Sequence, residues 1–378
     1  MAKVDHPSVM RVFYDHQVFS LQNAGGAARY HFELIAHLLR LFDVRIEILL
    51  GLHNTIYPFS SLAGPKLRVT GMTSSLRPGA KRYTINEGIS NVLASTCGTF
   101  DIYHPTLYRA MKLVRRRRIV VTHHDCAHER YPQMFRNAAL IVKNKRKLYE
   151  SADAVICVSE SSRRDLLHYY QVDPARAFVV YHGIKPFAVD EEQTTNSPPA
   201  QRPYLLFVGF RGTYKNFAML LHAYATSGIS RDYDLLTIGG GAFSLDELSI
   251  IKSLGVAHNV QNLQGVGDSR LAAIYRGASL FVYPSLYEGF GFPPLEAMSV
   301  GCPVLVSSTS SLPEICGDAA HYFDPEDPND LSRSLLNVLN SPDSLPTMRA
   351  RGYAQVSRYD WNQSAAKTHQ IYLNVLNQ

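Results

Sequence analysis

Two glutamates frame a glycine-containing turn in the second half of this 378-residue chain. The segment Glu288-Gly289-Phe290-Gly291-Phe292-Pro293-Pro294-Leu295-Glu296 follows a predicted strand at residues 280–283. Its two prolines suit the first turn of a helix. The backbone N–H groups and the dipole at a helix N-terminus hold phosphates and developing anions, and glycines let a ligand approach the main chain. The segment therefore predicts an anion-binding turn, the plain alternative being a helix cap with two incidental acids.

A basic loop lies upstream of this turn. The segment Phe207-Val208-Gly209-Phe210-Arg211-Gly212-Thr213-Tyr214-Lys215-Asn216 ends a strand predicted at 204–208. Two cations on one short loop can hold a diphosphate, because arginine and lysine stay charged when an anion approaches closely. A lone basic pair in a loop is usually solvated surface, but the position of Arg211 and Lys215 directly after a strand favours binding.

Glycine runs follow two other predicted strands. Gly239-Gly240-Gly241 comes at the end of a strand at 234–239, and Gly25-Gly26 lies between a strand at 9–14 and a helix at 27–40. A glycine turn before a helix can bring backbone N–H groups to a phosphate. Taken alone, each run is also typical of a simple turn.

Two histidines and an aspartate, His123-His124-Asp125, close a strand predicted at 119–122. A lone histidine is more often structural than catalytic. Parallel sheets, however, bind ligands at the carboxyl ends of their strands, so this cluster is a candidate for chemistry. With His128, the same side chains also have the types that a metal site needs.

Strands and helices alternate along both halves of the chain, which predicts an α/β protein with parallel sheets. A polar, proline-containing stretch at 187–203 is the best linker. We therefore expect two Rossmann-like domains that face each other across a cleft, at 1–190 and 200–358, with a C-terminal helix at about 360–378 packing back on the first. The predicted strands are 9–14, 44–50, 102–104, 119–122, 154–158 and 177–181, then 204–208, 234–239, 260–263, 280–283, 303–307 and 321–323.

The composition is that of an ordinary globular protein, with 46% hydrophobic and 19% charged residues. The sequence contains no run of 18 apolar residues, so no membrane span is predicted, and the first residues lack the apolar segment of a signal peptide. The five cysteines are scattered without a CxxC pair, which predicts reduced thiols in a cytoplasmic protein rather than a disulfide or zinc framework.

Charge is distributed unevenly. Residues 1–190 hold 26 Lys and Arg against 15 Asp and Glu, a net +11, and residues 191–378 hold 12 against 17, a net −5. The densest basic runs are Arg115–Arg118 and Lys143–Lys147. A basic half suggests an anionic partner such as a membrane surface or a lipid-linked phosphate, or it is simply a solvated face. No nucleic-acid partner is expected, because no recognisable nucleic-acid motif accompanies the charge.

The order and spacing of these motifs resemble glycosyltransferase family 4, whose members have the two-domain GT-B fold and retain the anomeric configuration. The resemblance implies that Glu288 sits near the donor sugar and that Glu296 binds the nucleotide ribose. It assigns Arg211 and Lys215 to the donor diphosphate. The glycines and apolar residues of the glutamate turn complete the implied donor contacts: Gly289, Phe290, Gly291 and Leu295.

The same resemblance covers the glycine runs and the loop after the strand at 260–263. It places Gly240 in a loop that closes on the donor, and Gly25 and Gly26 against the diphosphate from the opposite wall. The segment Gln264-Gly265-Val266-Gly267-Asp268 resembles the family's base-contacting loop. Val266 would contact the base through its backbone, and Asp268 would either accept from a guanine edge or cap a helix beginning near Leu271. GDP is therefore mildly preferred over UDP.

The histidine cluster also matches. The family's His-Asp pair aligns with His124-Asp125, which makes His124, rather than His123, the catalytic candidate beside Glu288. No cofactor and no metal are expected, because GT-B enzymes generally need no bound metal; the nucleoside diphosphate sugar is a co-substrate.

The chain is similar to bacterial transferases that build O-antigen or exopolysaccharide, often mannosyltransferases. This predicts an enzyme that moves a sugar, best taken as mannose from GDP-mannose, to a glycan or lipid-linked saccharide with retention. It would be cytoplasmic, or peripheral on the inner face of the plasma membrane. Alternatives are a UDP-sugar-dependent transferase, another GT-B enzyme such as a phosphorylase or epimerase, and a non-catalytic nucleotide-sugar-binding protein.

Overall fold

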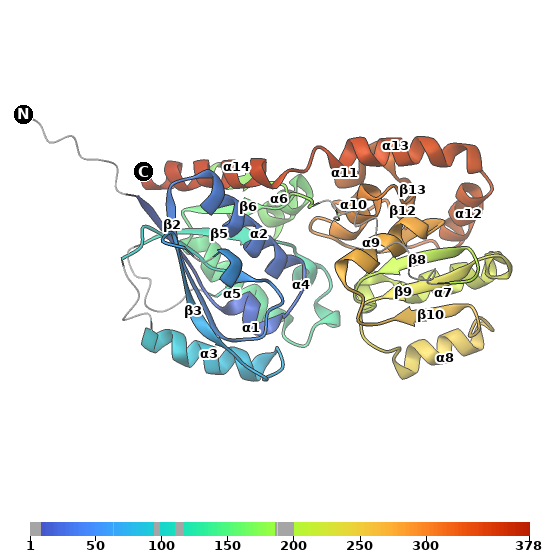
Figure 1. Cartoon of the computed structure of the whole chain (residues 1–378), viewed down its shortest axis with the longest axis horizontal. Coiled ribbons are helices and arrows are strands. Elements are labelled where there is room, and N and C mark those ends of the chain that lie inside the picture. The colour runs from blue at the N-terminus through green and yellow to red at the C-terminus, as the bar shows by residue number, and fades with distance from the viewer. Residues whose placement is uncertain (1–8, 63, 94–98, 110–116, 186, 188–199) are drawn as a thin grey trace, which may run out of the picture. The chain divides into compact units, whose positions relative to one another are not determined.

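The computed structural model describes residues 9–62, 64–93, 99–109, 117–185, 187 and 200–378. The chain forms two compact units, which we call unit 1 (Met1–Gly183 with Asp360–Gln378) and unit 2 (Ile184–Tyr359). Figure 1 colours them along the chain, with unit 1 from blue to green plus its red C-terminal helix, and unit 2 from yellow-green to orange-red. The chain enters unit 2 earlier than the predicted boundary at 190, and most of the predicted linker lies outside the described residues.

Unit 1 is built on a seven-stranded sheet in the order β3-β2-β1-β4-β5-β6-β7. Every strand pair in the described part of this sheet is parallel. The strands are β1 (Met10–Tyr14), β2 (Val44–His53), β3 (Leu67–Thr73), β4 (Ile102–His104), β5 (Arg118–His123), β6 (Ala154–Cys157) and β7 (Ala177–Val179).

Strand β3 was not predicted from the sequence. It lies at the edge of the sheet, and only Leu67 among its residues is buried. The strand therefore lacks both the continuous apolar run of a central strand and the alternation of a half-buried one, which are the patterns that identify strands in a sequence.

The helices of unit 1 include one from the far end of the chain. They are α1 (Gln17–Leu21), α2 (Gly26–Leu41), α3 (Ala80–Leu93), α4 (Ala127–Arg130), α5 (Ala138–Ser151), α6 (Glu160–Tyr169) and α14 (Trp361–Leu376). Helix α14 packs against α2. At the exit from unit 1, Gly183 lies so close to Trp361 that a Cβ atom there would be 2.2 Å from the Trp361 backbone nitrogen, so only glycine fits.

Unit 2 is built on a six-stranded sheet in the order β10-β9-β8-β11-β12-β13, again parallel in every described pair. The strands are β8 (Tyr204–Val208), β9 (Asp234–Ile238), β10 (Val260–Leu263), β11 (Leu280–Tyr283), β12 (Val304–Ser307) and β13 (His321–Phe323). All six were predicted to within a residue. Three of them, β9, β11 and β12, are buried along their whole length, and β8 is buried except at Val208, as expected for strands that are covered on both faces.

The described residues of unit 2 form seven α-helices. They are α7 (Phe217–Thr226), α8 (Leu245–Ser253), α9 (Asp268–Gly277), α10 (Phe292–Ser299), α11 (Leu312–Cys316), α12 (Pro328–Leu339) and α13 (Leu345–Val356). Helix α9 begins at Asp268, three residues before the predicted start near Leu271. In the core, Leu220, Leu221 and Tyr224 of α7 pack with Leu331 and Leu335 of α12.

The strand order reverses beside the first strand of each sheet, between β1 and β4 in unit 1 and between β8 and β11 in unit 2. Such switch points open a crevice at the carboxyl ends of the strands, where ligands of open parallel sheets bind. Several of the predicted site residues follow these strand ends. In the described part of the chain, no helix combines the length and the apolar character that crossing a bilayer requires.

Candidate active site

The glutamate turn of unit 2 connects β11 to α10. Gly291 precedes the helix with φ of +114°, a left-handed conformation that favours glycine. Two serines from the loop after β12 hold the turn. The Ser310 hydroxyl accepts from the Glu288 N–H at 2.9 Å, and the Ser311 hydroxyl lies 2.9 Å from the Glu288 carbonyl and 2.7 Å from that of Phe290. The main chain around Glu288 is therefore fixed from a neighbouring loop.

Lys215 and Glu288 form an ion pair at the carboxyl ends of β8 and β11. The Lys215 ammonium also donates to the Tyr283 hydroxyl at 3.0 Å, and burial raises the pKa of that tyrosine, which stays protonated. Only 9% of Lys215 is exposed. The predicted diphosphate cation and the predicted sugar-side carboxylate thus lie together, as one site requires.

Glu296 lies on α10 and is also 9% exposed. Its carboxylate accepts from the Tyr275 hydroxyl of α9 at 3.3 Å. Burial, followed by the charge of Glu296, raises the pKa of Tyr275, so the tyrosine remains a hydrogen-bond donor. Tyr275 therefore orients the carboxylate predicted to bind the ribose.

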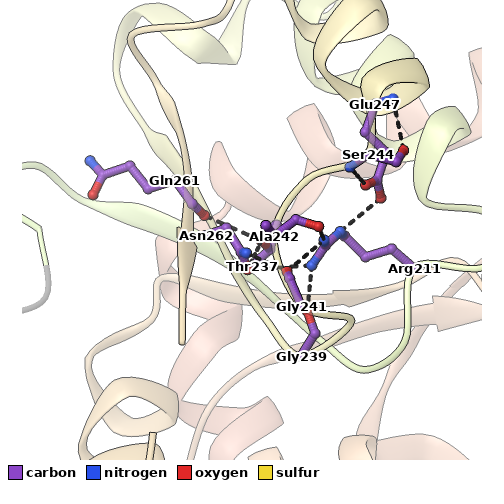
Figure 2. Close-up of polar contacts among 9 residues, drawn as sticks. All are labelled: Arg211, Thr237, Gly239, Gly241, Ala242, Ser244, Glu247, Gln261 and Asn262. Atoms are coloured by element: carbon purple, nitrogen blue, oxygen red, sulfur yellow. Dashed lines mark hydrogen bonds and ion pairs between the residues drawn. The ribbon is translucent and has the colours of Figure 1, made fainter. Parts of the chain in front are cut away.

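Arg211 points toward the glycine run after β9 (Figure 2). Its guanidinium donates to the carbonyls of Gly239, Gly241 and Ala242. The remaining contacts go to Glu247 at 2.7 Å and to the amide oxygen of Asn262 at 3.3 Å. These five contacts use all five N–H donors of a guanidinium. As the structure stands, Arg211 has no N–H group left for the predicted diphosphate.

The glycine run needs its glycines. Gly239, Gly240 and Gly241 have φ of +97°, +72° and +72°. A Cβ atom on Gly239 would lie 2.8 Å from the Gly209 carbonyl oxygen, and one on Gly240 would lie 3.1 Å from the Arg211 guanidinium. The predicted loop that includes Gly240 is thus wrapped tightly around Arg211.

The predicted base-contacting loop follows β10, at the edge of the sheet in unit 2. Val266 is half-buried and Asp268 is exposed in the first turn of α9. Within the described residues the Asp268 carboxylate makes no hydrogen bond or ion pair, and the capping position itself is occupied by Gly267. Both predicted residues are therefore accessible on one loop.

The glycine pair of unit 1 lies at the start of α2. Gly25 has φ of +152°, both glycines are exposed, and the first turn of the helix carries no acid, which leaves it suited to an anion. The Tyr57 hydroxyl donates to the Gly25 carbonyl at 3.2 Å. The loop that leads into the pair is held from below by a second arginine.

This second arginine, Arg82 of α3, is completely buried. Its five N–H donors meet five neutral oxygens. These are the carbonyls of Phe19, Ser20 and Leu76 and the side-chain oxygens of Asn23 and Asn54. Among the described residues, no carboxylate lies within ion-pair distance of Arg82. A buried arginine therefore fixes the segment before Gly25 by backbone and amide dipoles alone.

His123 and His124 have different environments at the end of β5. Both ring nitrogens of His123 are in contact, with the Tyr149 hydroxyl at 2.7 Å and the Cys126 sulfur at 3.5 Å. The Nε2 atom of His124 is buried and has no hydrogen-bond partner in the described part of the chain. Burial lowers the pKa of His124 to about 4, so its ring is neutral at neutral pH. Of the two, His124 alone has a ring nitrogen to offer a ligand.

The segment after His124 is held by Lys145 of α5. This buried ammonium donates to the Asp125 carbonyl at 2.7 Å and pairs with the Glu129 carboxylate at 3.1 Å. It also lies 4.6 Å from the centre of the Tyr108 ring, whose hydroxyl accepts from the His124 N–H at 3.0 Å. Among the described residues, no three His, Cys, Asp or Glu side chains are grouped as metal ligands.

Comparison with known families covers most of the chain. Residues 24–186 match the family described as Glycosyltransferase Family 4, and residues 189–355 match Glycosyl transferases group 1. The O-antigen chain mannosyltransferase B of Escherichia coli is 31% identical over 289 residues, which are 72% of this chain and 74% of the relative. The chain belongs to glycosyltransferase family 4.

A second relative of this glycosyltransferase is the MMP alpha-(1->4)-mannosyltransferase of Mycolicibacterium hassiacum, 26% identical over 75% of this chain and 72% of the relative. Sucrose-phosphate synthase from Thermosynechococcus elongatus has a similar structure, with a TM-score of 0.77 and 18% identity over 97% of this chain and 99% of that one. Anabaena HepE in complex with UDP-glucose gives 0.71 and 16%, over 96% and 99%. These structures establish the GT-B fold class, and the relatives establish a glycosyltransferase.

Several residues that hold the candidate site in place are not among those predicted from the sequence. Ser310, Ser311, Tyr275 and Tyr283 act on the predicted glutamates and lysine through hydrogen bonds, and Arg82 acts on the loop before the glycine pair. None belongs to a motif. The available signal was weak: Tyr283 ends a predicted strand next to the glutamate turn, and the serines follow another strand end.

Proposed function

We propose that this glycosyltransferase transfers mannose from GDP-mannose to a glycan or lipid-linked saccharide in cell-surface polysaccharide synthesis, with retention of configuration. The observation that carries the proposal is the Lys215–Glu288 pair beside the start of α10, in a chain with two relatives, described above, that are named as mannosyltransferases. The cation, the carboxylate and the helix N-terminus match what a diphosphate leaving group and its sugar require.

The leaving-group charge is the main barrier in this reaction. Lys215, the backbone N–H groups of the glycine loop and the N-terminus of α10 would stabilise it as the bond to the sugar breaks. In the ligand-free protein Lys215 pairs with Glu288. Diphosphate binding would share the ammonium between the two anions, leaving the Glu288 carboxylate beside the positively charged sugar. The acceptor hydroxyl would give its proton to a donor phosphate oxygen.

His124 is the residue of unit 1 that we assign to the sugar and acceptor. Its low pKa of about 4 keeps the ring neutral, and Nε2 lacks a partner in the described residues. A neutral ring can hydrogen-bond a hydroxyl without adding positive charge near an oxocarbenium-like sugar. We further propose that the reaction needs no bound metal, with Lys215 and backbone N–H groups in the role that a cation would otherwise fill.

Donor identity can be tested directly. Ligands that bind only the folded protein raise its unfolding temperature by mass action, so GDP, UDP and their sugars are compared by thermal unfolding and then by hydrolysis and transfer. GDP-mannose should give the largest stabilisation and turnover without added metal, and Glu288→Ala should abolish turnover while retaining GDP binding. A UDP-sugar preference would favour the second candidate, for which HepE's complex with UDP-glucose is the precedent. Binding without turnover would indicate a non-catalytic protein.

Peripheral membrane association is a separate part of the proposal. Lys143, Arg146 and Lys147 are exposed on α5 together with Leu140, which is 59% exposed. Lys145 is not part of this surface, because it is buried against Glu129. Of the other basic run, Arg115 and Arg116 lie outside the described residues. Salt-sensitive binding to anionic liposomes, lost in the Lys143→Glu/Lys147→Glu double variant, is expected. No binding at low salt would disprove the association.

A further inference from the structure

The role of Arg211 differs from that of a diphosphate ligand. We infer that Arg211 is a positioning residue: it holds the loop at 239–243 so that three backbone N–H groups face the nucleotide diphosphate, and it does not touch that group itself. This inference rests on the proposed function for the identity of the ligand. The bracing of the loop does not depend on that function.

The loop's carbonyls establish the direction of its N–H groups. The Arg211 guanidinium donates to the carbonyls of Gly239, Gly241 and Ala242 (Figure 2). The described chain contains no cis peptide bond, and in a planar trans peptide the C=O and the following N–H point in opposite directions. The N–H groups of Gly240, Ala242 and Phe243 therefore point away from the guanidinium.

These three N–H groups have no hydrogen-bond partner among the described residues. Successive backbone N–H groups that converge from one turn form an anion-binding concavity. The glycines that permit the turn have positive φ and leave the main chain uncovered. The face of the loop opposite Arg211 is thus a set of uncommitted donors, which is what a diphosphate binds.

The cation is itself held from behind. One Glu247 oxygen accepts from Arg211 at 2.7 Å, and the other accepts from the Ser244 N–H at 2.7 Å in a capping box that begins α8. Asn262 accepts from Arg211 and donates to the Gly241 carbonyl at 2.6 Å. Glu247 and Asn262 thus tie the arginine to α8 and β10, and the loop to the arginine.

Two opposed predictions follow for Glu247→Ala. If Arg211 gripped the diphosphate, removal of a carboxylate that competes for the guanidinium would strengthen nucleotide binding. If Arg211 positions the loop, the same change loosens its anchor and weakens binding. The direction in which Glu247→Ala changes nucleotide affinity therefore distinguishes a direct ligand from a positioning residue. Glu247 itself supplies no group to the nucleotide.

The experiment compares Arg211→Lys, Glu247→Ala and the double variant with wild type by calorimetric titration of GDP and of UDP. Arg211→Lys keeps the charge but loses the five-donor fork, and should weaken binding by about tenfold, the equivalent of one charge-assisted hydrogen bond. Glu247→Ala should weaken it by about threefold, and the double variant by no more than Arg211→Lys alone, because the two act on one element. Tighter binding by Glu247→Ala would overturn the inference.

Arg202→Lys is the matched control. Arg202 bonds the Asp234 carboxylate at 3.1 Å at the amino ends of the same two strands, β8 and β9, and its replacement should leave GDP and UDP binding unchanged. A second readout needs no ligand: the amide order parameters of residues 239–243 should fall below about 0.6 in both single variants. Wild-type protein that binds neither GDP nor UDP would refute the proposed function. The order parameters would still show whether Arg211 holds the loop at 239–243 in place. Unchanged order parameters in both variants would refute the positioning role of Arg211.

Discussion

Each unit of this glycosyltransferase holds a glycine loop with one arginine, and the two arginines differ in what surrounds them. Arg82 in unit 1 is fully buried among five neutral oxygens. Arg211 in unit 2 is 9% exposed, and one of its five partners is the carboxylate of Glu247. An arginine whose five N–H donors are all used can therefore belong to a fully buried core, or it can hold a loop that is exposed to solvent.

The exposure of the two loops determines how much unfolding free energy is lost when each arginine is replaced. Phe19 and Ser20, which accept from Arg82, are buried, whereas residues 239–242 are exposed. When a buried acceptor loses its partner, its desolvation penalty remains. At the loop of unit 2, water can replace the arginine, and the loss then appears in loop order and binding rather than in folding.

The largest effect is expected for Arg82→Met, which removes a donor from five oxygens, including the buried carbonyls of Phe19 and Ser20. Loss of about 4 kcal/mol of unfolding free energy is expected, against about 1 kcal/mol for Arg211→Met, where water substitutes. The only tryptophan, Trp361, is buried in unit 1, so its fluorescence during urea unfolding reports that unit. Equal losses of unfolding free energy in Arg82→Met and Arg211→Met would contradict the proposed difference between the two arginines.

The second largest effect is expected at Lys215, which donates to side chains, whereas Arg211 donates to loop carbonyls. Lys215→Ala should lower kcat/KM for the sugar donor by about 100-fold, the size expected when one group that stabilises leaving-group charge is removed. Arg211→Lys should cost less, because it acts through the loop. Steady-state kinetics with Arg202→Lys as the control measures both. If the order of the two effects were reversed, Arg211 would be the direct ligand.

A third test uses pH to compare the units. Burial lowers the pKa of His104 to about 3 and of His124 to about 4, and it also lowers those of His31 and His182, all in unit 1. The three histidines of unit 2 are exposed. A depressed histidine pKa contributes stability that is present above about pH 6.5 and is lost as the pH falls toward the folded-state value.

Unit 1 should therefore unfold first in acid, with each unit of pKa depression worth about 1.4 kcal/mol at most. Trp361 fluorescence, which reports unit 1, should change at a higher pH than the part of the far-UV circular dichroism that comes from unit 2. Coincident transitions would show that the buried histidines do not set the acid stability of unit 1.

The smallest effect is expected for Tyr57→Phe, which removes the hydroxyl that donates to the Gly25 carbonyl. This contact is at the exposed side of the loop in unit 1, where an exchange with water costs little, so a change in donor KM of about twofold or less is expected. A larger effect in kinetic assays would show that Arg82 alone does not hold this loop.

Much of the fold could be predicted because central parallel strands are continuous apolar runs. All six strands of unit 2 and six of unit 1 were expected, and only the exposed edge strand β3 was missed. Prediction of the site was less complete. Glu288, Lys215 and Glu296 lie in motifs, but Ser310, Tyr275 and Arg82 meet their partners only through long-range contacts, and such contacts leave no local pattern.

The sequence by itself determined the family and the α/β character of both halves, because these depend on motif order and on periodicities that persist whatever the detailed packing. The tertiary structure decided which partners surround residues of equivalent chemistry. It separated His124 from His123 by the partners of their ring nitrogens, and Lys215 from Arg211 by the direction that each cation faces. Residue type fixes how many donors a side chain has, but only folding determines which acceptors reach them first.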